Sequence, residues 1–492
     1  MPAKQSIKFI LDDRVVEIDF KGAEKLTPTT TVLQYLRSLP GHKGVKEGCG
    51  QGDCGACTVV LAEPDGRGDL VYKAVNSCLI FLPMIHGKQL ITVENIAEEK
   101  DDNDIVLHPV QTALIRHDGT QCGYCTPGMA ASMLALYKNH RNPSKETVED
   151  ALSGNLCRCT GYRSVVDAAL EACKVKDDDH FTKNKEKTVN LLNTLNQETE
   201  TVVIKARGHT YMKPFTVVEA LKLRRDNPGA MVITGATDAA LLKTKKHFVP
   251  EKILDLSALD ELKLILEDHH RIVIGTGISL EEVRQYCVSR LPALAELLRV
   301  FGSLQIRNMA TMGGNLMSAS PIGDTLPMLI ALGAKVRLLG NNKQRELPVE
   351  NFITGYRKTD IHDDEIPALI MIPKPKKNVL IKSYKISKRT DLDISTVSAC
   401  FRMVLTRENR VREIDIVYGG MADRPKRAAA TAMVLKDELW SAALVEHAMQ
   451  QLEKEFQPLS DARAAAGTRL IMAKNLLMKF WLDTRRPELT NS

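Results

Sequence analysis

Residues 48–59, GCGQGDCGACTV, determine what the first third of this chain can fold around. Three cysteines lie among four glycines in these twelve residues. A disulfide needs two cysteines and no special backbone freedom, whereas a chain that wraps a small inorganic group must turn sharply and bring its amides close to that group. The stretch is therefore predicted to wrap an inorganic group.

The spacing of the cysteines indicates which group this is. Cys49, Cys54 and Cys57 follow a C-x4-C-x2-C pattern, and Cys78 comes after twenty intervening residues. This is the plant-type ferredoxin arrangement, in which four thiolates hold a [2Fe-2S] cluster. The glycines allow positive φ angles and direct backbone N–H groups toward the sulfides. A zinc site would favour paired C-x2-C knuckles instead, so the spacing favours iron.

A second cysteine set follows in residues 121–162. Cys122 and Cys125 form a C-x2-C pair, and Cys157 and Cys159 form a C-x-C pair. Each pair lies at the end of a predicted helix, so antiparallel helices would bring the two pairs together. Spacing alone suits tetrahedral zinc as readily as iron.

Composition limits the remaining possibilities. The 492 residues are too many for one core and indicate about three or four units. The chain is 44% hydrophobic and 26% charged, without a membrane-spanning apolar run or a signal-peptide core, which predicts a cytoplasmic protein. The net charge of +6 is scattered along the chain, so nucleic acid is not implied. Eight of the 11 cysteines cluster early, which favours metal over disulfides, and Cys173, Cys287 and Cys400 are expected to be inert thiols.

Periodicity divides the chain into parts. Residues 6–19 read as a hairpin turning at Asp12–Asp13, followed by a helix at 31–38 and strands at 58–63, 70–75 and 91–96. Helical spacing then covers residues 129–140, 144–154 and 162–175. Beyond Pro214 the pattern is α/β, with helices at 217–227 and 281–291 and strands at 231–235, 252–257 and 271–277. The last part has strands near 383–389, 395–405 and 413–420, then helices.

These patterns predict a multidomain α+β protein. The expected parts are a β-grasp ferredoxin-like domain (1–96), a four-helix-bundle domain that carries the second cysteine set (97–175), a linker with at most one helix at 189–196 (176–206), an α/β domain (207–379) and a C-terminal α+β subdomain (380–492).

Two stretches of the α/β part have features of a cofactor site. MVITGATDAA (231–240) is a strand that runs through a small-residue turn into a helix, which suits a phosphate group. The second stretch, residues 307–324, contains Gly313–Gly314, Ser320 and Asp324. Neither is a G-x-G-x-x-G fingerprint, and each taken alone could be an ordinary α/β turn.

The order of the cysteine motifs, together with QCGYCTPGM (121–129) and GNLCRCTGYR (154–163), resembles the molybdenum hydroxylase family, and within it the xanthine dehydrogenases. The resemblance extends from about residue 5 to residue 480. It implies that the second cysteine set also holds a [2Fe-2S] cluster and that the α/β part binds FAD.

The resemblance also implies individual cofactor residues. Phe301 would lie against the flavin or adenine, Lys385 near the isoalloxazine, and Gln121 and Cys159 near a pterin. The remaining FAD-binding residues implied are Val232, Ile233, Thr234, Gly235, Ala236, Thr237, Asp238, Ala239, Thr311, Gly313, Gly314, Asn315 and Asp324.

The activity implied by the resemblance is an electron relay. Electrons from a molybdopterin-bound molybdenum on a large partner subunit would pass through the two clusters to FAD and then to NAD+ during oxidation of hypoxanthine and xanthine. The expected assembly is a heterotetramer of two small and two large chains, and no catalytic residue for the purine step is expected on this chain. The alternatives are another molybdenum hydroxylase, acting on aldehydes, carbon monoxide or N-heterocycles, and a non-redox protein stapled by zinc. Whether NAD+ or oxygen accepts the electrons stays open.

Overall fold

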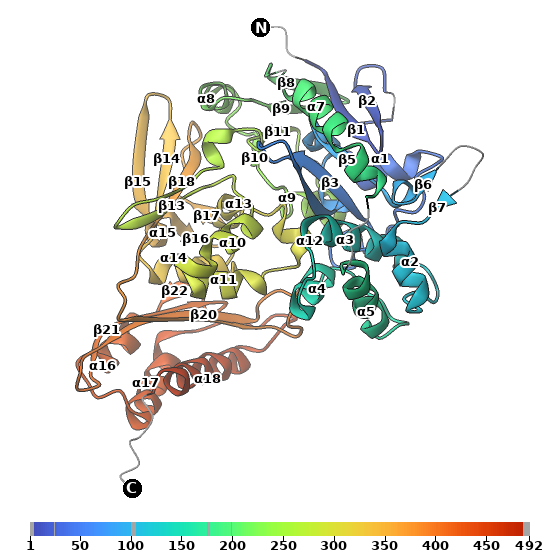
Figure 1. Cartoon of the computed structure of the whole chain (residues 1–492). Coiled ribbons are helices and arrows are strands. Elements are labelled where there is room, and N and C mark those ends of the chain that lie inside the picture. The colour runs from blue at the N-terminus through green and yellow to red at the C-terminus, as the bar shows by residue number, and fades with distance from the viewer. Residues whose placement is uncertain (1–3, 24, 100–104, 175–177, 198, 486–492) are drawn as a thin grey trace. The chain divides into compact units, whose positions relative to one another are not determined.

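The structure is a computed structural model that describes residues 4–23, 25–99, 105–174, 178–197 and 199–485 (Figure 1). Its contacts divide the chain into two compact units. The first unit contains Met1–Asp260 and Gly302–Ala310, and the second contains Glu261–Phe301 and Thr311–Ser492. Each unit is described by itself below.

The first unit begins with a five-stranded mixed sheet in the order β2-β1-β5-β3-β4. The central pair β1 and β5 is parallel, and the other neighbours are antiparallel. One helix, α1, follows the hairpin, which gives the β-grasp arrangement. The elements are β1 (Ser6–Leu11), β2 (Arg14–Asp19), α1 (Val32–Ser38), β3 (Thr58–Pro64), β4 (Leu70–Asn76), η1 (Ser77–Leu79), η2 (Leu82–Ile85) and β5 (Gln89–Ile91).

The strand predicted for residues 91–96 differs from the structure. The strand β5 ends at Ile91, and a 3-10 turn (Val93–Asn95) follows. The Thr92 N–H donates to the Asp12 carboxylate at 2.8 Å, so this amide is not available to a neighbouring strand. Asp12 occupies the tight turn between β1 and β2 with a φ of 54°.

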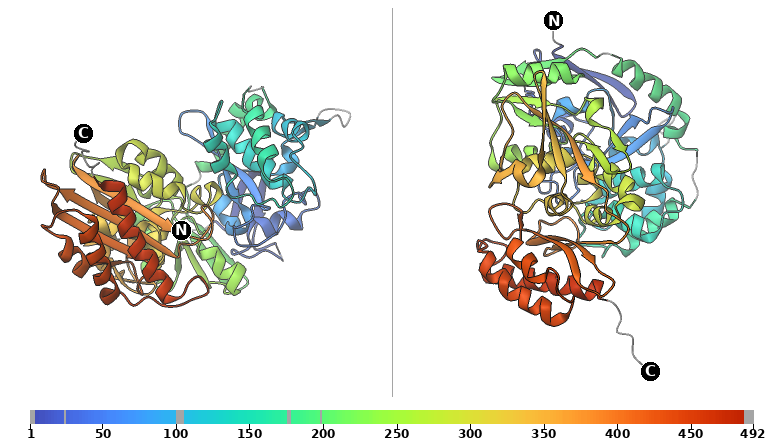
Figure 2. Two further views of the ribbon diagram at one scale, coloured as in Figure 1. Left: turned by 90° about the horizontal axis from the view of Figure 1, so that it is seen from below. Right: turned by 90° about the vertical axis from the view of Figure 1, so that its left-hand side faces the viewer.

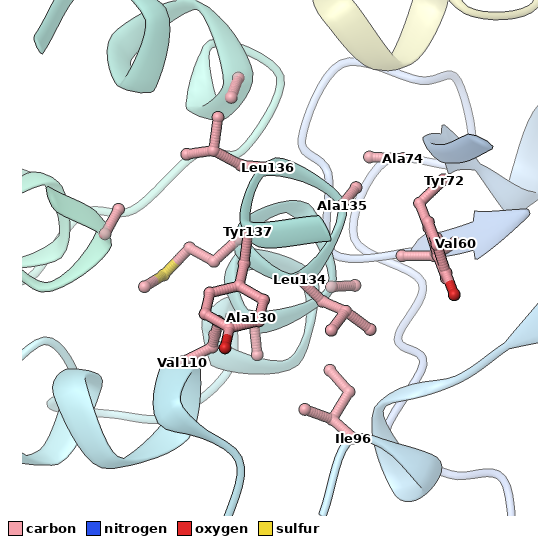
Figure 3. Packing of buried hydrophobic residues seen from close by; sticks show 14 of the residues in the cluster. Val60, Tyr72, Ala74, Ile96, Val110, Ala130, Leu134, Ala135, Leu136 and Tyr137 are labelled. Carbon is pink, nitrogen blue, oxygen red and sulfur yellow. The ribbon is translucent and has the colours of Figure 1, made fainter. Parts of the chain in front are cut away.

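Four helices form the second part of this unit. They are α2 (Pro109–Arg116), α3 (Thr126–Asn139), α4 (Lys145–Leu152) and α5 (Arg163–Ala172), and a short ribbon of β6 (Glu98–Glu99) and β7 (Ile105–Val106) precedes them. The central helix α3 contacts β3 and β4 as well as α2, α4 and α5, so it is buried nearly all round. Figure 3 shows Leu134 and Tyr137 of α3 with Ile96 and Val110 packed near them. The helix α2 is an addition to the helices predicted from periodicity.

The described part of segment 176–206, predicted as a linker, carries regular structure. It contains α6 (His180–Lys183), α7 (Lys185–Asn196) and β8 (Val202–Ala206), while residues 176, 177 and 198 lie outside the described residues. The strand β8 pairs with β9, so the predicted boundary at residue 207 falls inside a hairpin. The sheet runs β10-β11-β9-β8, with β10, β11 and β9 parallel. Its further elements are β9 (His209–Lys213), α8 (Val217–Asp226), β10 (Met231–Ile233), α9 (Ala239–Lys246) and β11 (Lys252–Asp255).

The second unit contains an antiparallel five-stranded sheet in the order β12-β13-β18-β14-β15. Its strands are β12 (Ile265–Glu267), β13 (Arg271–Gly275), β14 (Lys335–Gly340), β15 (Lys343–Pro348) and β18 (Ile366–Pro373). The helices and the small ribbon around it are α10 (Leu280–Arg290), α11 (Pro292–Arg299), α13 (Met312–Ser318), α14 (Thr325–Ala331), α15 (Val349–Phe352), β16 (Ile353–Gly355) and β17 (Lys358–Thr359). The short helix α12 (Leu304–Arg307) lies in the first unit.

The second unit ends with a four-stranded antiparallel sheet and three helices. These elements are β19 (Val379–Ile386), β20 (Val397–Leu405), β21 (Val411–Gly419), β22 (Lys426–Arg427), α16 (Ala429–Leu435), α17 (Ala442–Glu455) and α18 (Ala466–Thr484). The helices cover one face of the sheet, as Figure 2 shows, and bury Phe401, Tyr418 and Phe480 between the layers. The multidomain α+β architecture predicted from the sequence is therefore confirmed. Among the residues that the structure describes, no helix combines the length and the apolar character needed to cross a bilayer.

Candidate functional site

The first cysteine set comes together as two pairs at one end of the β-grasp sheet. Cys57 directly precedes β3 and Cys78 lies in η1, and their sulfurs are 3.4 Å apart in a buried position. Cys49 and Cys54, from the loop before β3, form the second pair through a side-chain hydrogen bond. The long glycine-rich loop is what allows residues 49 and 54 to reach the sheet end that carries the other pair.

Backbone amides surround these sulfurs. The Gln51 and Asp53 N–H groups donate to Cys49 Sγ at 3.4 Å and 3.3 Å. Further N–H donors are Ala56 toward Cys54 and Gly52 toward Cys78. Gly52 has a φ of +80°, a conformation that a side chain disfavours, and this conformation presents its amide to the sulfur. The loop therefore supplies the N–H dipoles that stabilise negative charge on a cluster.

The hydrogen bond within each pair makes the pKa values of its two thiols differ. The Cys54 S–H donates to Cys49 and lowers the pKa of Cys49 to about 5, while the same bond raises the pKa of Cys54. The hydrogen bond between Cys57 and Cys78 lowers the pKa of Cys57 and raises the pKa of Cys78. Each pair thus holds one sulfur ready to ionise, and the thiolate is the form that binds metal.

The second cysteine set also forms two pairs, each with one member from either motif. Cys122 and Cys125 precede α3, and Cys157 and Cys159 precede α5. Side-chain hydrogen bonds join Cys125 to Cys157 and Cys122 to Cys159. The structure therefore brings together the two motifs that the sequence analysis expected to converge.

In the second set, Cys157 Sγ accepts two hydrogen bonds from its own loop. The Thr160 hydroxyl and the Cys159 N–H donate to it at 3.3 Å and 3.4 Å. Burial acts to raise its pKa, but these hydrogen bonds outweigh burial and lower the pKa of Cys157 to about 7. Burial raises the pKa of its partner Cys125 to about 12.

The rim of the second set is exposed. Cys122 and Cys159 are both exposed, and so is Gln121 directly before Cys122. Large apolar side chains of the same loops are exposed too, namely Tyr124 (47%), Leu156 (39%) and Tyr162 (36%). Cys57 and Cys78 of the first set are buried by contrast.

The pairing of the sulfurs is what a diiron cluster requires. In a [2Fe-2S] cluster each iron takes two cysteine thiolates, whereas tetrahedral zinc needs four ligands around one centre. Within the described residues, no three His, Cys, Asp or Glu side chains form a group that could hold a single metal ion. Both sets offer two pairs with nearby N–H or hydroxyl donors, so the residues fit [2Fe-2S] clusters.

The first stretch expected to bind a dinucleotide lies in the first unit. Val232 and Ile233 end β10, Thr234 to Asp238 form the turn, and Ala239 begins α9. A Cβ atom at Gly235 would lie only 1.8 Å from the Met309 carbonyl oxygen, so this position requires glycine. The turn carries small side chains with Thr237 partly exposed and Asp238 exposed, which fits a turn that a phosphate can approach.

The second stretch lies in the second unit. The Thr311 hydroxyl accepts a hydrogen bond from the Gly314 N–H at 2.9 Å and caps α13. Gly313 packs directly on Thr276, and its N–H donates to the Thr276 carbonyl at 3.1 Å. Asn315 accepts from the Thr325 hydroxyl at 2.5 Å. These polar contacts hold the turn, and Gly314, which has no side chain, is exposed in it.

Asp324 and Lys385 form one buried ion pair in the second unit, with Nζ and Oδ2 2.9 Å apart. Lys385 also donates to the Val300 carbonyl at 2.9 Å, next to the partly buried Phe301. The Ser395 hydroxyl donates to the other Asp324 oxygen at 2.5 Å. Sequence reasoning did not identify Ser395 or Thr276, because single hydroxyl residues in strand or turn sequences give no signal of their long-range partners.

Four family models match the chain in succession. A "2Fe-2S iron-sulfur cluster binding domain" matches residues 19–82, and a "[2Fe-2S] binding domain" matches residues 92–170. A "FAD binding domain in molybdopterin dehydrogenase" matches residues 204–375, and a "CO dehydrogenase flavoprotein C-terminal domain" matches residues 382–484. The first two matches each contain one of the cysteine sets.

Several curated proteins are similar over nearly the whole chain. The xanthine dehydrogenase/oxidase of Gallus gallus is 30% identical over 543 residues, which cover 96% of this chain and 39% of the relative. The xanthine dehydrogenase of Emericella nidulans is 30% identical and covers 99% of this chain and 40% of the relative. That of Drosophila pseudoobscura is 31% identical, with 95% and 39% covered. The chain thus spans about two fifths of the length of these relatives.

Solved structures share the fold of part of the chain. A carbon monoxide dehydrogenase from Hydrogenophaga pseudoflava aligns with a TM-score of 0.53 at 25% identity, covering 55% of this chain and 94% of that chain. Quinoline 2-oxidoreductase from Pseudomonas putida 86 aligns with a TM-score of 0.53 at 20% identity, covering 57% and 98%.

Proposed function

This chain is the iron–sulfur and FAD-binding part of a molybdenum hydroxylase, and we propose that it serves as the electron-relay subunit of a xanthine dehydrogenase. In this function it takes electrons from a molybdenum centre on a large partner subunit and passes them through two [2Fe-2S] clusters and FAD to NAD+. The substrates are hypoxanthine and xanthine. The full-length relatives named xanthine dehydrogenase support this choice of substrate.

One observation carries the proposal: each cysteine set forms two thiol pairs with nearby hydrogen-bond donors. The ligands are Cys49, Cys54, Cys57 and Cys78 for one cluster, and Cys122, Cys125, Cys157 and Cys159 for the other. When bound, the clusters would supply one-electron transfer and FAD would supply the collection of two electrons for hydride transfer to NAD+.

The residues of this chain hold and tune these groups. The Gln51 and Asp53 amides would stabilise the extra negative charge that reduction places on the first cluster. Burial of Cys57 and Cys78 keeps water from that side of the cluster. The FAD-binding residues proposed in the first unit are those of the turn at Val232–Ala239, whose small side chains would let a phosphate approach the backbone. Those proposed in the second unit are Phe301, Thr311–Asn315 and the Asp324–Lys385 pair. No residue of this chain is assigned to the purine step.

The exposed rim of the second cluster supports a partner subunit. Cys122 and Cys159 are exposed beside Tyr124, Leu156 and Tyr162, and aromatic side chains of this kind are enriched in protein interfaces. The molybdopterin-binding subunit would cover this rim, with Gln121 and Cys159 facing the pterin. We propose a heterotetramer of two small and two large chains. The described residues include all eleven cysteines, and none of them is in a disulfide, which suits the reducing cytoplasm.

A second substrate class has its own support. The structural relatives named for carbon monoxide and for quinoline share the fold of more than half of this chain, so the same relay could serve a hydroxylase of another substrate. Substrate choice would then depend entirely on the partner subunit.

Purification of the native complex tests the function. We expect a larger chain to copurify with molybdenum, and the preparation to contain FAD, iron and acid-labile sulfide. Xanthine should reduce NAD+ to NADH. Absence of inorganic sulfide would contradict the cluster assignment, and absence of a larger chain would contradict the subunit assignment. NADH formation from an aldehyde or a heterocycle instead of xanthine would favour the second substrate class.

A pair of lysine variants tests the flavin site. Lys385→Met removes the charge that pairs with Asp324 and should lower the FAD content while iron content is unchanged. Lys382→Met changes a partly exposed lysine of the same strand and should retain FAD. Equal FAD contents in the two variants would contradict a role for Lys385.

A further inference from the structure

The two cysteine loops are in direct backbone contact. The Leu156 N–H donates to the Cys54 carbonyl at 2.9 Å, and the Asn155 side-chain amide donates to the Gly55 carbonyl at 3.1 Å and to the Thr58 hydroxyl at 3.2 Å. Cys54 belongs to the first set, and residues 155 and 156 directly precede Cys157 of the second. A movement of either loop therefore changes the spacing of the two sets.

Glycines make this contact possible. A Cβ atom at Gly55 would lie 2.3 Å from the Gly154 carbonyl oxygen, and one at Gly128 would lie 2.2 Å from the Gly55 carbonyl oxygen. Side chains at these positions would separate the loops. The Gly55 carbonyl accepts from the Thr58 N–H and hydroxyl of its own loop at 3.0 Å and 2.7 Å, and the Asn155 amide adds the hydrogen bond that reaches it from the second loop.

Gln305 fixes that amide. Its side chain is 1% exposed, and its Nε2 lies 2.9 Å from Asn155 Oδ1, 3.0 Å from Ser132 Oγ and 3.0 Å from the Ala151 carbonyl. Ser132 Oγ itself donates to Asn155 Oδ1 at 2.7 Å. With two donors on its oxygen, Asn155 must direct its NH2 group toward Gly55 and Thr58.

The orientation of the Gln305 amide follows from the same acceptors. Reversing it would place Oε1 against the Ala151 carbonyl and Asn155 Oδ1, which repel another oxygen. In the observed orientation Oε1 is buried and has no hydrogen-bond partner among the described residues. A Cβ at Gly154 would lie 2.1 Å from this oxygen, so the backbone of the second loop also packs against it.

The segment that carries Gln305 is firmly anchored in the first unit. The buried Arg307 donates to both carboxylate oxygens of Asp150 at 2.8 Å and 2.7 Å, and Asn308 donates to the Ala74 carbonyl at 2.8 Å. Both bonds come from one guanidinium nitrogen, Nη2, and charge-assisted hydrogen bonds of this kind are stronger than neutral ones. Gln305 is thus a fixed support, on the segment whose sequence continues into Thr311–Asn315.

We propose that Gln305 is a positioning residue for the pair of clusters. Acting through Asn155, it holds the Cys54–Gly55 backbone against the loop that carries Cys157, and so sets the spacing and the local hydrogen bonding of the two clusters without touching a sulfur. This role rests on the proposed function, because it requires that both cysteine sets bind [2Fe-2S].

The test uses the purified protein loaded with both clusters. Gln305→Met keeps the length of the side chain and removes its donors. We expect unchanged iron and sulfide, but a changed magnetic interaction between the two reduced clusters in the electron paramagnetic resonance spectrum. We also expect a roughly two- to tenfold change in the ratio of reduced to oxidised first cluster at a fixed potential.

Asn308→Ala is the matched control, because it removes a hydrogen bond of the same segment that reaches β4 and no cysteine loop. It should leave both spectroscopic quantities as in the wild type. Asn155→Ala should reproduce the change, and Gln305→Met should add nothing further in that background.

The outcomes separate the two proposals. Wild-type protein without sulfide or without a paramagnetic signal after reduction overturns the proposed function and this inference with it. Wild-type protein with both clusters, and a Gln305→Met spectrum identical to it, overturns the inference alone. If Gln305→Met does not fold, the same measurement is made on Ser132→Ala, which removes one donor to Asn155 and keeps Gln305. Unchanged spectra and potentials in Ser132→Ala would also overturn the inference.

Discussion

The two cysteine sets use the same pairing of sulfurs in different surroundings. The first set lies against the end of a β-sheet, with Cys57 and Cys78 buried and amides directed at the sulfurs. The second precedes two helices and leaves Cys122 and Cys159 exposed beside aromatic side chains. The first site is therefore enclosed by its own domain at Cys57 and Cys78, whereas the second site leaves two of its four sulfurs exposed.

Replacing one ligand in each set is the strongest way to break this comparison. Cys57→Ser should abolish the first cluster and destabilise its domain, because Cys57 is buried directly before β3. Cys159→Ser should abolish the second cluster while the fold is retained, because Cys159 is exposed and lies outside any helix or strand. Each variant should lose about half of the iron and sulfide.

Iron and sulfide analysis, paramagnetic resonance and thermal unfolding measure these effects. Loss of both clusters in Cys159→Ser would show that the two sites do not assemble separately. Equal melting temperatures for the two variants would contradict the difference in enclosure.

The next prediction concerns the buried ion pair between Asp179 and Lys138, near the helix that follows Cys125. Asp179 accepts from Lys138 at 2.9 Å and pairs with His108 at 3.0 Å, and it caps α6 through the Thr182 N–H at 2.7 Å. Lys138 lies in the last turn of α3, the helix that begins beside Cys125. Asp179→Asn leaves Lys138 as a poorly compensated charge and should cost about 3–5 kcal/mol of unfolding free energy. Lys145→Met, at an exposed pair with Glu149, should cost less than about 0.5 kcal/mol.

The unfolding free energy should also depend on pH through the ionisation of Asp179. Burial alone would raise the pKa of Asp179, but His108 and Lys138 outweigh it and hold the pKa well below its usual value. The carboxylate therefore stabilises the fold above a pH of about 4, and this stability is lost as the pH falls toward the folded-state pKa. Urea unfolding of the wild type and Asp179→Asn between pH 7 and pH 3 measures it. A constant difference between the two proteins over that range would contradict the assignment.

Glycine variants sharpen the comparison at a smaller scale. Gly55 (φ +69°) and Gly161 (φ +66°) both adopt a left-handed conformation, one in each cysteine loop. Gly161→Ala meets open space and should cost only the conformational strain, about 1 kcal/mol. Gly55→Ala adds a clash with the Gly154 carbonyl and should cost about 3 kcal/mol. Equal losses in urea unfolding would indicate that the contact between the loops is not tight.

The sequence predicted the parts of this molecule that depend on local signals. The hairpin turning at Asp12–Asp13 and the helix at residues 144–154 follow from turn residues and periodicity, and both are present. The helix α2 was not predicted, although Val110, Ala113 and Leu114 follow the i, i+3, i+4 spacing of a buried helix face, because it is only eight residues long and its cap is the side chain of His108, an unusual capping residue. In residues 176–206 the single helix allowed at 189–196 is present as part of α7, but α6 and β8 were not predicted, because β8 forms only by pairing with β9.

The candidate sites show the same limit. Cysteine spacing gave the two sets, but it could not show that Cys122 pairs with Cys159, since that depends on how α3 and α5 pack. The resemblance named Asp324 and Lys385 separately, and the structure joins them in one ion pair. Gln305 and Asn155 are 150 residues apart, and neither has a local pattern that distinguishes it from an ordinary polar residue. Contacts of this range are set by tertiary packing, which spacing does not encode.

The last expected effect is a difference in acid sensitivity within the β-grasp part. His86 lies between η2 and β5, accepts the Lys8 N–H at 3.0 Å and is buried near Lys213 and Lys4. Burial, assisted by these lysines, lowers the pKa of His86 to about 4. The unfolded chain binds a proton near pH 6.5 and the folded chain does not, so stability falls as the pH drops from about 6.5 toward 4.

Between pH 7 and pH 5 this histidine should remove about 2 kcal/mol of unfolding free energy, before Asp179 begins to titrate. His86→Gln can still accept the Lys8 amide and carries no titrating group, so its unfolding free energy should change less over the same range. Urea unfolding of both proteins at pH 7 and pH 5 measures the difference. Equal losses of unfolding free energy in the wild type and the variant would show that His86 is not the cause of the acid sensitivity. The surroundings of the two cysteine sites would then not differ in the pH at which they lose stability.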